Sequence, residues 1–371
     1  MRPNFFILTL VFVWPLFSSS QETSLISENS PLERESLKWN FDIRYRLEGK
    51  TDQSISQVTD NNSFLMARLG FVTQLDKQFK VALRLATGTG SPSSTNQTLG
   101  SDGLLGGKAF NLDRAYIQWL VTPSVSAFAG KIKNILYRPG HSQMQWDSDY
   151  NPEGFAVQYE KEFSESYGLA VRAVNYNIDT TTNEATYPTM FGLQIQGHYF
   201  STNVDANITL DGIQYLDLDS RPGYGSVGTN TLSGGAYIHD YSPVGGGFDV
   251  TFKHWLKPIQ IFADYAENGL VDSDNVAYQA GFRYGNAEQV YDWDFKALFK
   301  EIGKDAALDL FPDASFMGGG TDNRGSMLKL GYKSSNASIV HLVYYGGERY
   351  ISNESQKSDY EAWQGQITLR Y

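Results

Sequence analysis

Large apolar residues alternate with polar ones along much of the chain. Residues 39–48 read WNFDIRYRLE, with an apolar residue at every odd position and a polar one at every even position. The same alternation recurs in residues 79–85, 191–199 and 291–299. Successive side chains of a strand point to opposite faces of its sheet. The pattern therefore predicts strands that each have one apolar face and one polar face.

Turns and polar loops divide these segments into 16 expected strands, because seven short connections alternate strictly with eight long ones. The short turns fall at residues 75–77, 122–124, 163–166, 201–203, 254–257, 285–288 and 333–336. The long loops cover roughly residues 50–62, 88–108, 134–151, 178–188, 213–245, 267–274, 301–324 and 346–360. An even number of strands lets an antiparallel sheet close into a barrel with both chain ends on one side of a membrane.

Residues 231–240 are compatible with one further strand. Counting them as a strand would place the short turn at His254 on the side of the long loops. We therefore expect residues 231–240 to lie inside a long outer loop. In a later loop, residues 305–311 are compatible with one or two helical turns that cover the mouth of the barrel.

The ends of the segments favour a membrane wall over a soluble sandwich or propeller. Period two alone fits both, because the apolar face of a soluble sheet packs on another layer. Tyrosine and tryptophan, however, gather at the segment ends, as they do in the aromatic girdles of transmembrane barrels. They include Trp39, Trp119, Tyr159, Tyr167, Tyr199, Trp255, Tyr265, Tyr284, Tyr291, Tyr332 and Tyr345. We predict an all-β fold: a 16-stranded antiparallel transmembrane β-barrel with short periplasmic turns and long outer loops.

The chain stops on a strand, because residues 363–371 alternate and the last residue is Tyr371. A terminal strand with an aromatic end resembles the assembly signal of bacterial outer-membrane proteins. Closure of the barrel requires this strand to pair with residues 39–49, since an open sheet edge in lipid leaves backbone groups without hydrogen bonds.

The N-terminus has the three parts of an export signal. Arg2 precedes an apolar run of 13 residues from Phe5 to Phe17, and three serines follow it. A spanning helix would need about 20 apolar residues, so a transmembrane anchor is the weaker interpretation. We expect residues 1–20 to be a cleaved signal peptide, residues 21–38 a polar leader and residues 39–371 the barrel.

Composition excludes several other classes of protein. The 30 Lys and Arg against 41 Asp and Glu give a net charge of -11, which argues against nonspecific nucleic-acid binding. The absence of cysteine excludes disulfides, thiolate metal sites and a lipid-modified N-terminal cysteine. Asp147, Asp149 and Asn151 have the spacing of a calcium loop, but Pro152 replaces the required glycine. We expect no cofactor and no metal.

Several motifs lie between residues 83 and 154: Leu83–Gly88 followed by Ser94–Thr95, Asp113–Trp119, Gly130–Lys131 and Trp146–Gly154. On these motifs the chain resembles, over most of residues 39–371, the Gram-negative general porins, and more closely a family of the same type called the putative porins. The resemblance implies a diffusion pore in the outer membrane that is often trimeric and that folds its third outer loop into the barrel. The expected partners are outer-membrane lipid, small hydrophilic solutes and ions, and two further copies of the chain.

The polar faces of the first strands predict the lining of this pore. Five arginines would form a basic wall: Arg44, Arg46, Arg68, Arg84 and Arg114. The third long loop, residues 134–151, is the candidate constriction, and an acidic group in or beside it would face that wall: Asp147, Asp149 and Glu153. Such an arrangement would select ions by their charge. Alternatively, these arginines only bridge their neighbours and select nothing.

Two other functional classes remain open. A substrate-selective channel for sugars, phosphate or fatty acids would need aromatic residues or a dense arginine ladder along the bore. An outer-membrane enzyme would need a nucleophile beside a histidine. The five histidines belong to no recognisable nucleophile motif, which favours a channel over an enzyme: His141, His198, His239, His254 and His341.

Overall fold

The computed structural model describes residues 37–53, 56–88, 91, 93–100, 106–180, 187–224 and 229–371. The expected signal peptide lies outside these residues, as does the expected leader up to residue 36. In the described residues, no helix is long and apolar enough to cross a membrane.

Sixteen antiparallel strands form a closed wall, which confirms the predicted fold and strand number. They are β1 (Lys38–Asp52), β2 (Ser56–Gln74), β3 (Phe79–Thr87), β5 (Phe110–Thr122), β6 (Val125–Lys131), β7 (Glu153–Glu162), β8 (Tyr167–Asn177), β9 (Thr189–Phe200), β10 (Val204–Leu216), β13 (Pro243–Phe252), β14 (Ile259–Asn268), β15 (Val276–Tyr284), β16 (Trp293–Ile302), β17 (Asn323–Lys333), β18 (Ser338–Arg349) and β19 (Ser358–Arg370). The two-residue strand β4 (Gln97–Thr98) pairs with β2.

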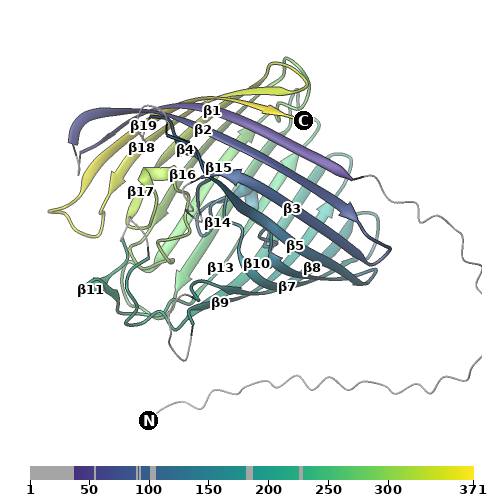
Figure 1. Cartoon of the computed structure of the whole chain (residues 1–371), viewed down its shortest axis with the longest axis horizontal. Coiled ribbons are helices and arrows are strands. Elements are labelled where there is room, and N and C mark those ends of the chain that lie inside the picture. Colours follow the sequence, from purple (N-terminus) through teal and green to yellow (C-terminus); the bar gives the residue numbers. More distant parts are fainter. Residues whose placement is uncertain are drawn as a thin grey trace, which may run out of the picture. The chain divides into compact units, whose positions relative to one another are not determined.

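The first and last wall strands close the barrel (Figure 1). Their register runs from Asp42 opposite Arg370 to Asp52 opposite Tyr360. Beyond this ladder, the backbone N–H of Tyr371 donates to the carbonyl of Phe41 at 2.9 Å. The predicted pairing of the chain end with residues 39–49 is therefore confirmed.

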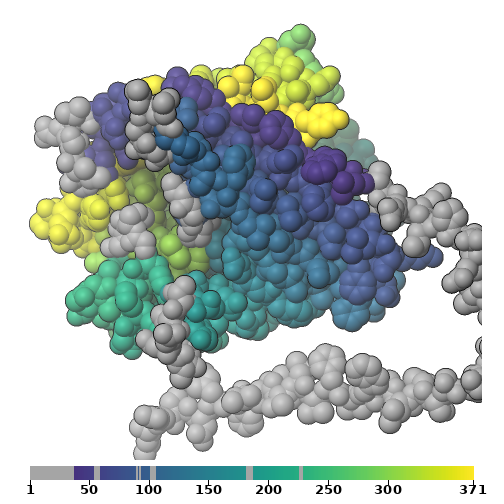
Figure 2. All heavy atoms as spheres, in the orientation of Figure 1, coloured from purple at the N-terminus to yellow at the C-terminus, as the bar shows by residue number. Residues whose placement is uncertain are grey.

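Alternation along each strand places apolar side chains on the outside of the wall. On β1, Trp39 is 54% exposed and Leu47 is 46% exposed, whereas Arg46 between such positions is buried inside the barrel. Cross-strand aromatic pairs lie at the short-turn ends, for example Phe79 stacked on Trp119 at 6.0 Å. In Figure 2 the side chains of the first wall strands, in purple and blue, form a continuous surface. This is the distribution that lipid requires of a barrel wall.

The connections follow the predicted alternation of short and long. Within the short turn after β2, the Asp76 carboxylate accepts hydrogen bonds from the backbone N–H groups of Gln78 and Phe79. The long connection between β10 and β13 contains a small hairpin, β11 (Leu232–Ser233) with β12 (Ala236–Tyr237). The expectation that residues 231–240 lie in an outer loop is confirmed.

The loops contain two short 3-10 turns, η1 (Pro139–His141) and η2 (Phe316–Gly318). The expected helical turns at residues 305–311 do not form. Their carboxylates bind another loop instead: Asp309 accepts from the N–H of Thr229 at 2.8 Å and Asp305 from the N–H of Thr231 at 2.9 Å. These contacts, distant in sequence, hold the segment in an irregular path.

An apolar core lies inside the barrel, where loop residues meet the inward faces of β7–β10. Loop residues Trp146 and Phe311 pack against the strand residue Tyr215, with Trp146 and Phe311 rings 5.4 Å apart. Val174, Tyr176, Met190 and Ile213 complete the strand side of this core. Side chains of this core fill part of the bore beside β7–β10.

Candidate permeation pathway

The connection between β6 and β7, residues 132–152, enters the bore instead of staying at its rim. Ile132, directly after β6, is completely buried, and Met144 in the middle of the loop is also completely buried. This segment contains the predicted constriction loop, residues 134–151. We call residues 132–152 the inner loop.

The tip of the inner loop is fixed to the wall formed by β13, β14 and β16. Asp249 on β13 accepts hydrogen bonds from the Tyr137 hydroxyl at 2.7 Å and from the Gly140 N–H at 3.1 Å. Lys296 on β16 donates to the Gly140 carbonyl at 2.7 Å. Gly140 has φ 55°, and a Cβ there would stand 2.2 Å from the ring of Phe262 on β14. The tip therefore needs glycine for both its backbone conformation and its close approach.

The returning arm of the inner loop is fixed to the other side of the bore, at β2 and β5. Asp149 forms an ion pair with Arg68 on β2 at 3.2 Å. Asn151 accepts from the Nε of Arg114 at 2.7 Å and donates to Asp113 at 2.9 Å, both on β5. Because its tip and its returning arm bind different walls, the inner loop spans the barrel.

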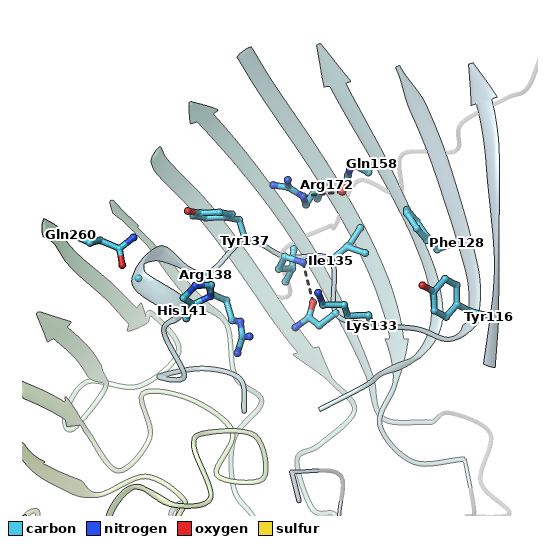
Figure 3. A pocket seen from close by; sticks show the side chains of 13 residues that line it. Tyr116, Phe128, Lys133, Ile135, Tyr137, Arg138, His141, Gln158, Arg172 and Gln260 are labelled. Carbon is cyan, nitrogen blue, oxygen red and sulfur yellow. Dashed lines mark hydrogen bonds between the residues drawn. The ribbon is translucent and has the colours of Figure 1, made fainter. Parts of the chain in front are cut away.

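Two cavities lie along the inner loop. The smaller one, of about 380 Å³, lies beside the inward faces of β5–β8 and contains Tyr116, Phe128 and Arg172 (Figure 3). The larger one, of about 610 Å³, lies against β14–β19 and β1. Both are lined by Arg138, Gly140, His141 and Gln260. The tip of the inner loop therefore lines both cavities.

All five predicted arginines lie on inward faces, but they do not share one environment. Arg44 and Arg46 line the larger cavity. Arg44 donates to the side-chain oxygen of Asn96 at 2.8 Å, and Arg46 pairs with Glu48 at 3.4 Å. The other three lie behind the inner loop: Arg68 binds Asp42 and Asp149, Arg84 binds Asp113, and Arg114 binds Asn151.

The predicted acidic residues also separate. Asp149 lines the larger cavity while it binds Arg68. Asp147 accepts from the backbone N–H groups of Asp149 at 2.7 Å and Ala314 at 2.9 Å, and so joins the inner loop to the loop before η2. Glu153 is a correction to our expectation: it begins β7 on the face of Phe155, which is the outward face, and pairs with Lys131 at 2.8 Å.

Titratable groups of the inner loop have shifted pKa values. Burial, together with the neighbouring Asp313 and Asp149, raises the pKa of Asp147 to about 8. Burial and the nearby cations Lys296 and Arg138 lower the pKa of His141. The raised pKa favours the protonated form of Asp147 at neutral pH.

The pattern of alternation did not predict that Asp113 faces the bore. A β-bulge on β5 shifts the register between Arg84 and Leu85, so that Asp113 and Arg114 both point inward although they are consecutive. Asp113 is buried and binds Arg84 and Asn151. The neighbouring apolar residues give one sign of the bulge in the sequence. Leu112 and Ala115 both face outward although three positions separate them, and strict alternation would place them on opposite faces.

Sequence analysis also missed the charged wall of the last strands. The inward faces of β15, β16, β17 and β19 present four cations to the larger cavity: Arg283, Lys296, Lys329 and Arg370. Asp294 and Asp313 are the acidic residues added to that lining. Lys296 and Arg370 lie on predicted polar faces, but nothing in the sequence indicated that the cavity would lie against them.

A closed barrel with an apolar outer face, a polar bore and a loop folded inside is the architecture of outer-membrane channels. The family described as Putative porin matches residues 26–207 and 248–360, and the chain belongs to this family. This confirms the resemblance seen in the sequence. No curated protein is similar enough in sequence to match the chain.

Solved structures with the same fold are distant in sequence. OprB of Pseudomonas putida, determined at high pH, has 12% identity and a TM-score of 0.59 over 90% of this chain and 94% of its own. A triple mutant of the Rhodopseudomonas blastica porin has 11% identity and a TM-score of 0.51 over 91% of this chain and 100% of its own. OmpT of Vibrio cholerae without its loop L8, an outer-membrane protein, has 11% identity and a TM-score of 0.51 over 91% of this chain and 100% of its own.

Together, the family and the fold indicate an outer-membrane channel rather than an enzyme.

Proposed function

We propose that this protein is a porin that lets small hydrophilic solutes and ions diffuse passively across the outer membrane. The observation that supports this proposal is the pair of cavities inside the barrel that are both lined by the tip of the inner loop. Solutes would pass between Arg138, His141 and Gln260, and no moving part is required. In this proposal Asp149 contributes the acidic side of the constriction, and Arg44 and Arg46, which line the larger cavity, contribute its basic side.

The chain offers a direct test because it has no native cysteine. Gln260→Cys places a single thiol in the lining of both cavities, whereas Gln289→Cys places one on an exposed short turn between β15 and β16. Both variants are reconstituted in planar bilayers and treated with a bulky thiol reagent. We expect at least a two-fold fall in single-channel conductance for the first and no change for the second.

Equal responses of the two cysteines would show that Gln260 lies off the path and would defeat the proposed pathway. A parent protein that forms no channels at all would defeat the porin function itself.

A substrate-selective channel is the second candidate, and the smaller cavity favours it. Tyr116, Phe128 and Tyr137 provide aromatic surface there beside the polar Gln158 and Arg172. Aromatic surface next to hydrogen-bonding groups suits a sugar ring. Swelling rates of proteoliposomes in sugars of equal size distinguish the candidates: a passive pore sorts sugars by size, whereas a selective channel separates stereoisomers.

The location and the assembly are proposals of the same kind. We propose that the protein resides in the cell outer membrane as a homotrimer. It should then fractionate with outer membranes, resist carbonate extraction and run as a larger species on unheated gels. Recovery as a folded soluble protein would contradict the location, and a monomeric mass in detergent would contradict the trimer.

A further inference from the structure

Three cations stand directly opposite one another on the wall of the larger cavity. The register places Arg283 on β15 opposite Lys296 on β16, and Lys296 opposite Lys329 on β17. Like charges opposite each other on neighbouring strands repel and destabilise the sheet. Such a row persists in a folded barrel when opposite charges or counter-ions neutralise it.

The described protein residues supply only part of that neutralisation. Asp294 pairs with Arg283 at 2.5 Å. Lys296 binds the uncharged carbonyl of Gly140. The side chains of Lys329 and, on β19, Arg370 form no ion pair and no hydrogen bond with any described residue. The charged groups that act on Lys329 are Asp294 and three cations, Arg283, Arg44 and Arg370.

Two further nitrogen atoms at this wall have no partner. The Nε–H of Arg44 is buried without an acceptor among the described residues, and the Nδ1 of His341, a donor or an acceptor according to its tautomer, is also buried without a hydrogen-bond partner there. Both residues line the same cavity as Lys329 and Arg370. The site therefore offers several unused N–H groups around one space.

The acidic residues that face this wall are already engaged. Asp313 pairs with Lys300 at 3.6 Å, and Lys300 is buried. Asp147 binds backbone N–H groups, and Asp149 pairs with Arg68. No carboxylate among the described residues pairs with Lys329 or Arg370, so a solute is the remaining source of negative charge.

We propose that Lys329, Arg370 and Arg44 form a binding site for small dianions that carry phosphate or carboxylate groups, and that this site makes the channel anion-selective. The inference rests on the proposed porin function and adds its substrate class. Lysine ammonium and arginine guanidinium groups donate charge-assisted hydrogen bonds to phosphate and carboxylate oxygens. The oxygen atoms of a dianion can accept hydrogen bonds from several of these cations at once. Chloride has a single charge and no pair of oxygen atoms to accept a bidentate hydrogen bond.

The test compares two variants with the same change in net charge. Lys329→Gln with Arg370→Gln removes two cations that make no contact on which folding depends. Lys131→Gln with Lys161→Gln removes two cations from the outward face, near the barrel rim. Each protein is studied in planar bilayers by reversal potentials across a KCl gradient and by block of the chloride current with inorganic phosphate or succinate.

We expect the parent channel to prefer chloride over potassium and to be blocked by both dianions. Removal of one lumen charge should change the local anion-to-cation concentration ratio about two-fold, so the first variant should lower the anion-to-cation permeability ratio about four-fold. Its half-blocking dianion concentration should rise by at least the same factor. The outward control should keep the parent values. Block by phosphate alone would identify a phosphate site, and block by both a general dianion site.

A first variant with normal conductance, unchanged selectivity and unchanged block would overturn the anion site while leaving the porin function intact. A parent that conducts but prefers potassium would do the same. A parent that forms no channel would instead overturn the porin function on which this inference rests.

Discussion

The two charged walls of the bore differ in how their cations are neutralised. On the wall of β2–β5, Arg68 and Arg84 each bind a carboxylate. On the wall of β15–β19, the side chains of Lys329 and Arg370 form no ion pair and no hydrogen bond with the described residues. The first wall has the denser run of arginines in the sequence, yet the second faces the open cavity with less compensation.

The comparison separates two uses of a cation in a channel. Arg68 and Arg114 fix the inner loop through Asp149 and Asn151, so their charges hold the structure. The side chains of Lys329 and Arg370 form no ion pair or hydrogen bond with the described residues, so their charges remain available to solutes. A count of arginines on inward faces therefore does not measure the field that a solute meets.

The largest expected effect is on stability, and it should distinguish the walls. Arg84→Gln leaves Asp113 buried without its cation, which should lower the free energy of unfolding by about 3 kcal/mol. Lys329→Gln relieves a like-charge contact with Lys296 and should change it by less than about 0.5 kcal/mol. Urea unfolding of the barrels in lipid vesicles measures both values.

Restoring neutrality provides the control for this stability prediction. The double variant Arg84→Gln with Asp113→Asn removes both charges of the pair and should recover most of the loss. Equal destabilisation by Arg84→Gln and Lys329→Gln would contradict the difference that we draw between the two walls.

A second prediction concerns the loop tip that lines both cavities. Gly140→Ala forces a side chain onto the ring of Phe262 at positive φ and should cost about 1–3 kcal/mol. The tip should leave Asp249, and single-channel conductance should become noisy. Gly234→Ala is the matched control, because Gly234 has φ 58° but no atom within 4 Å of its added Cβ. Quiet recordings from Gly140→Ala would show that the tip does not line the pathway.

The third prediction uses the raised pKa of Asp147, which is about 8. Between pH 7 and pH 9 its carboxyl ionises and adds one negative charge beside the larger cavity. The anion-to-cation permeability ratio should therefore fall about two-fold over this range. In Asp147→Asn the part of this fall that comes from the Asp147 carboxyl should disappear. Reversal potentials recorded at pH 7 and pH 9 for both proteins measure the difference.

The same titration has a consequence for stability. The pKa of folded Asp147 lies above the ordinary value of 3.8, because burial and the neighbouring carboxylates of Asp313 and Asp149 favour its protonated form in the folded protein. This contribution is fully present below about pH 4 and is lost as the pH rises through about 8. Protease cleavage of the inner loop should become faster between pH 7 and pH 9 in the parent, and less so in Asp147→Asn.

The smallest effect is expected from the paired arginines. Arg68→Gln with Arg84→Gln should shift selectivity toward cations by less than about two-fold, because neither side chain lines the larger cavity. In the opposite direction, Asp149→Asn removes an acidic group that does line it and should favour anions. Both shifts should shrink in 1 M salt, where the screening length is ~3 Å. A shift from the paired arginines as large as that from Lys329 and Arg370 would contradict our account.

The barrel could be predicted from the sequence alone. Alternation, loop lengths and the terminal strand are properties of short segments, and a wall in lipid must satisfy its backbone by pairing neighbours in chain order. The strand number, the closure at Tyr371 and the inward position of the five arginines therefore follow from period two. Residues 231–240 were also correctly predicted to lie in a loop, because a further strand there would have placed the short turn at His254 on the side of the long loops.

The contents of the bore and the charges that remain unpaired depend on contacts between segments that are distant in the chain. Trp146 packs on Phe311, 165 positions away in the chain, and this contact fills part of the bore beside β7–β10. The bulge at Asp113 and the outward pair of Glu153 with Lys131 changed the faces that alternation had assigned. Neutralisation of a charge depends on groups within a few ångströms, and those groups come from distant loops whose paths carry no periodic pattern.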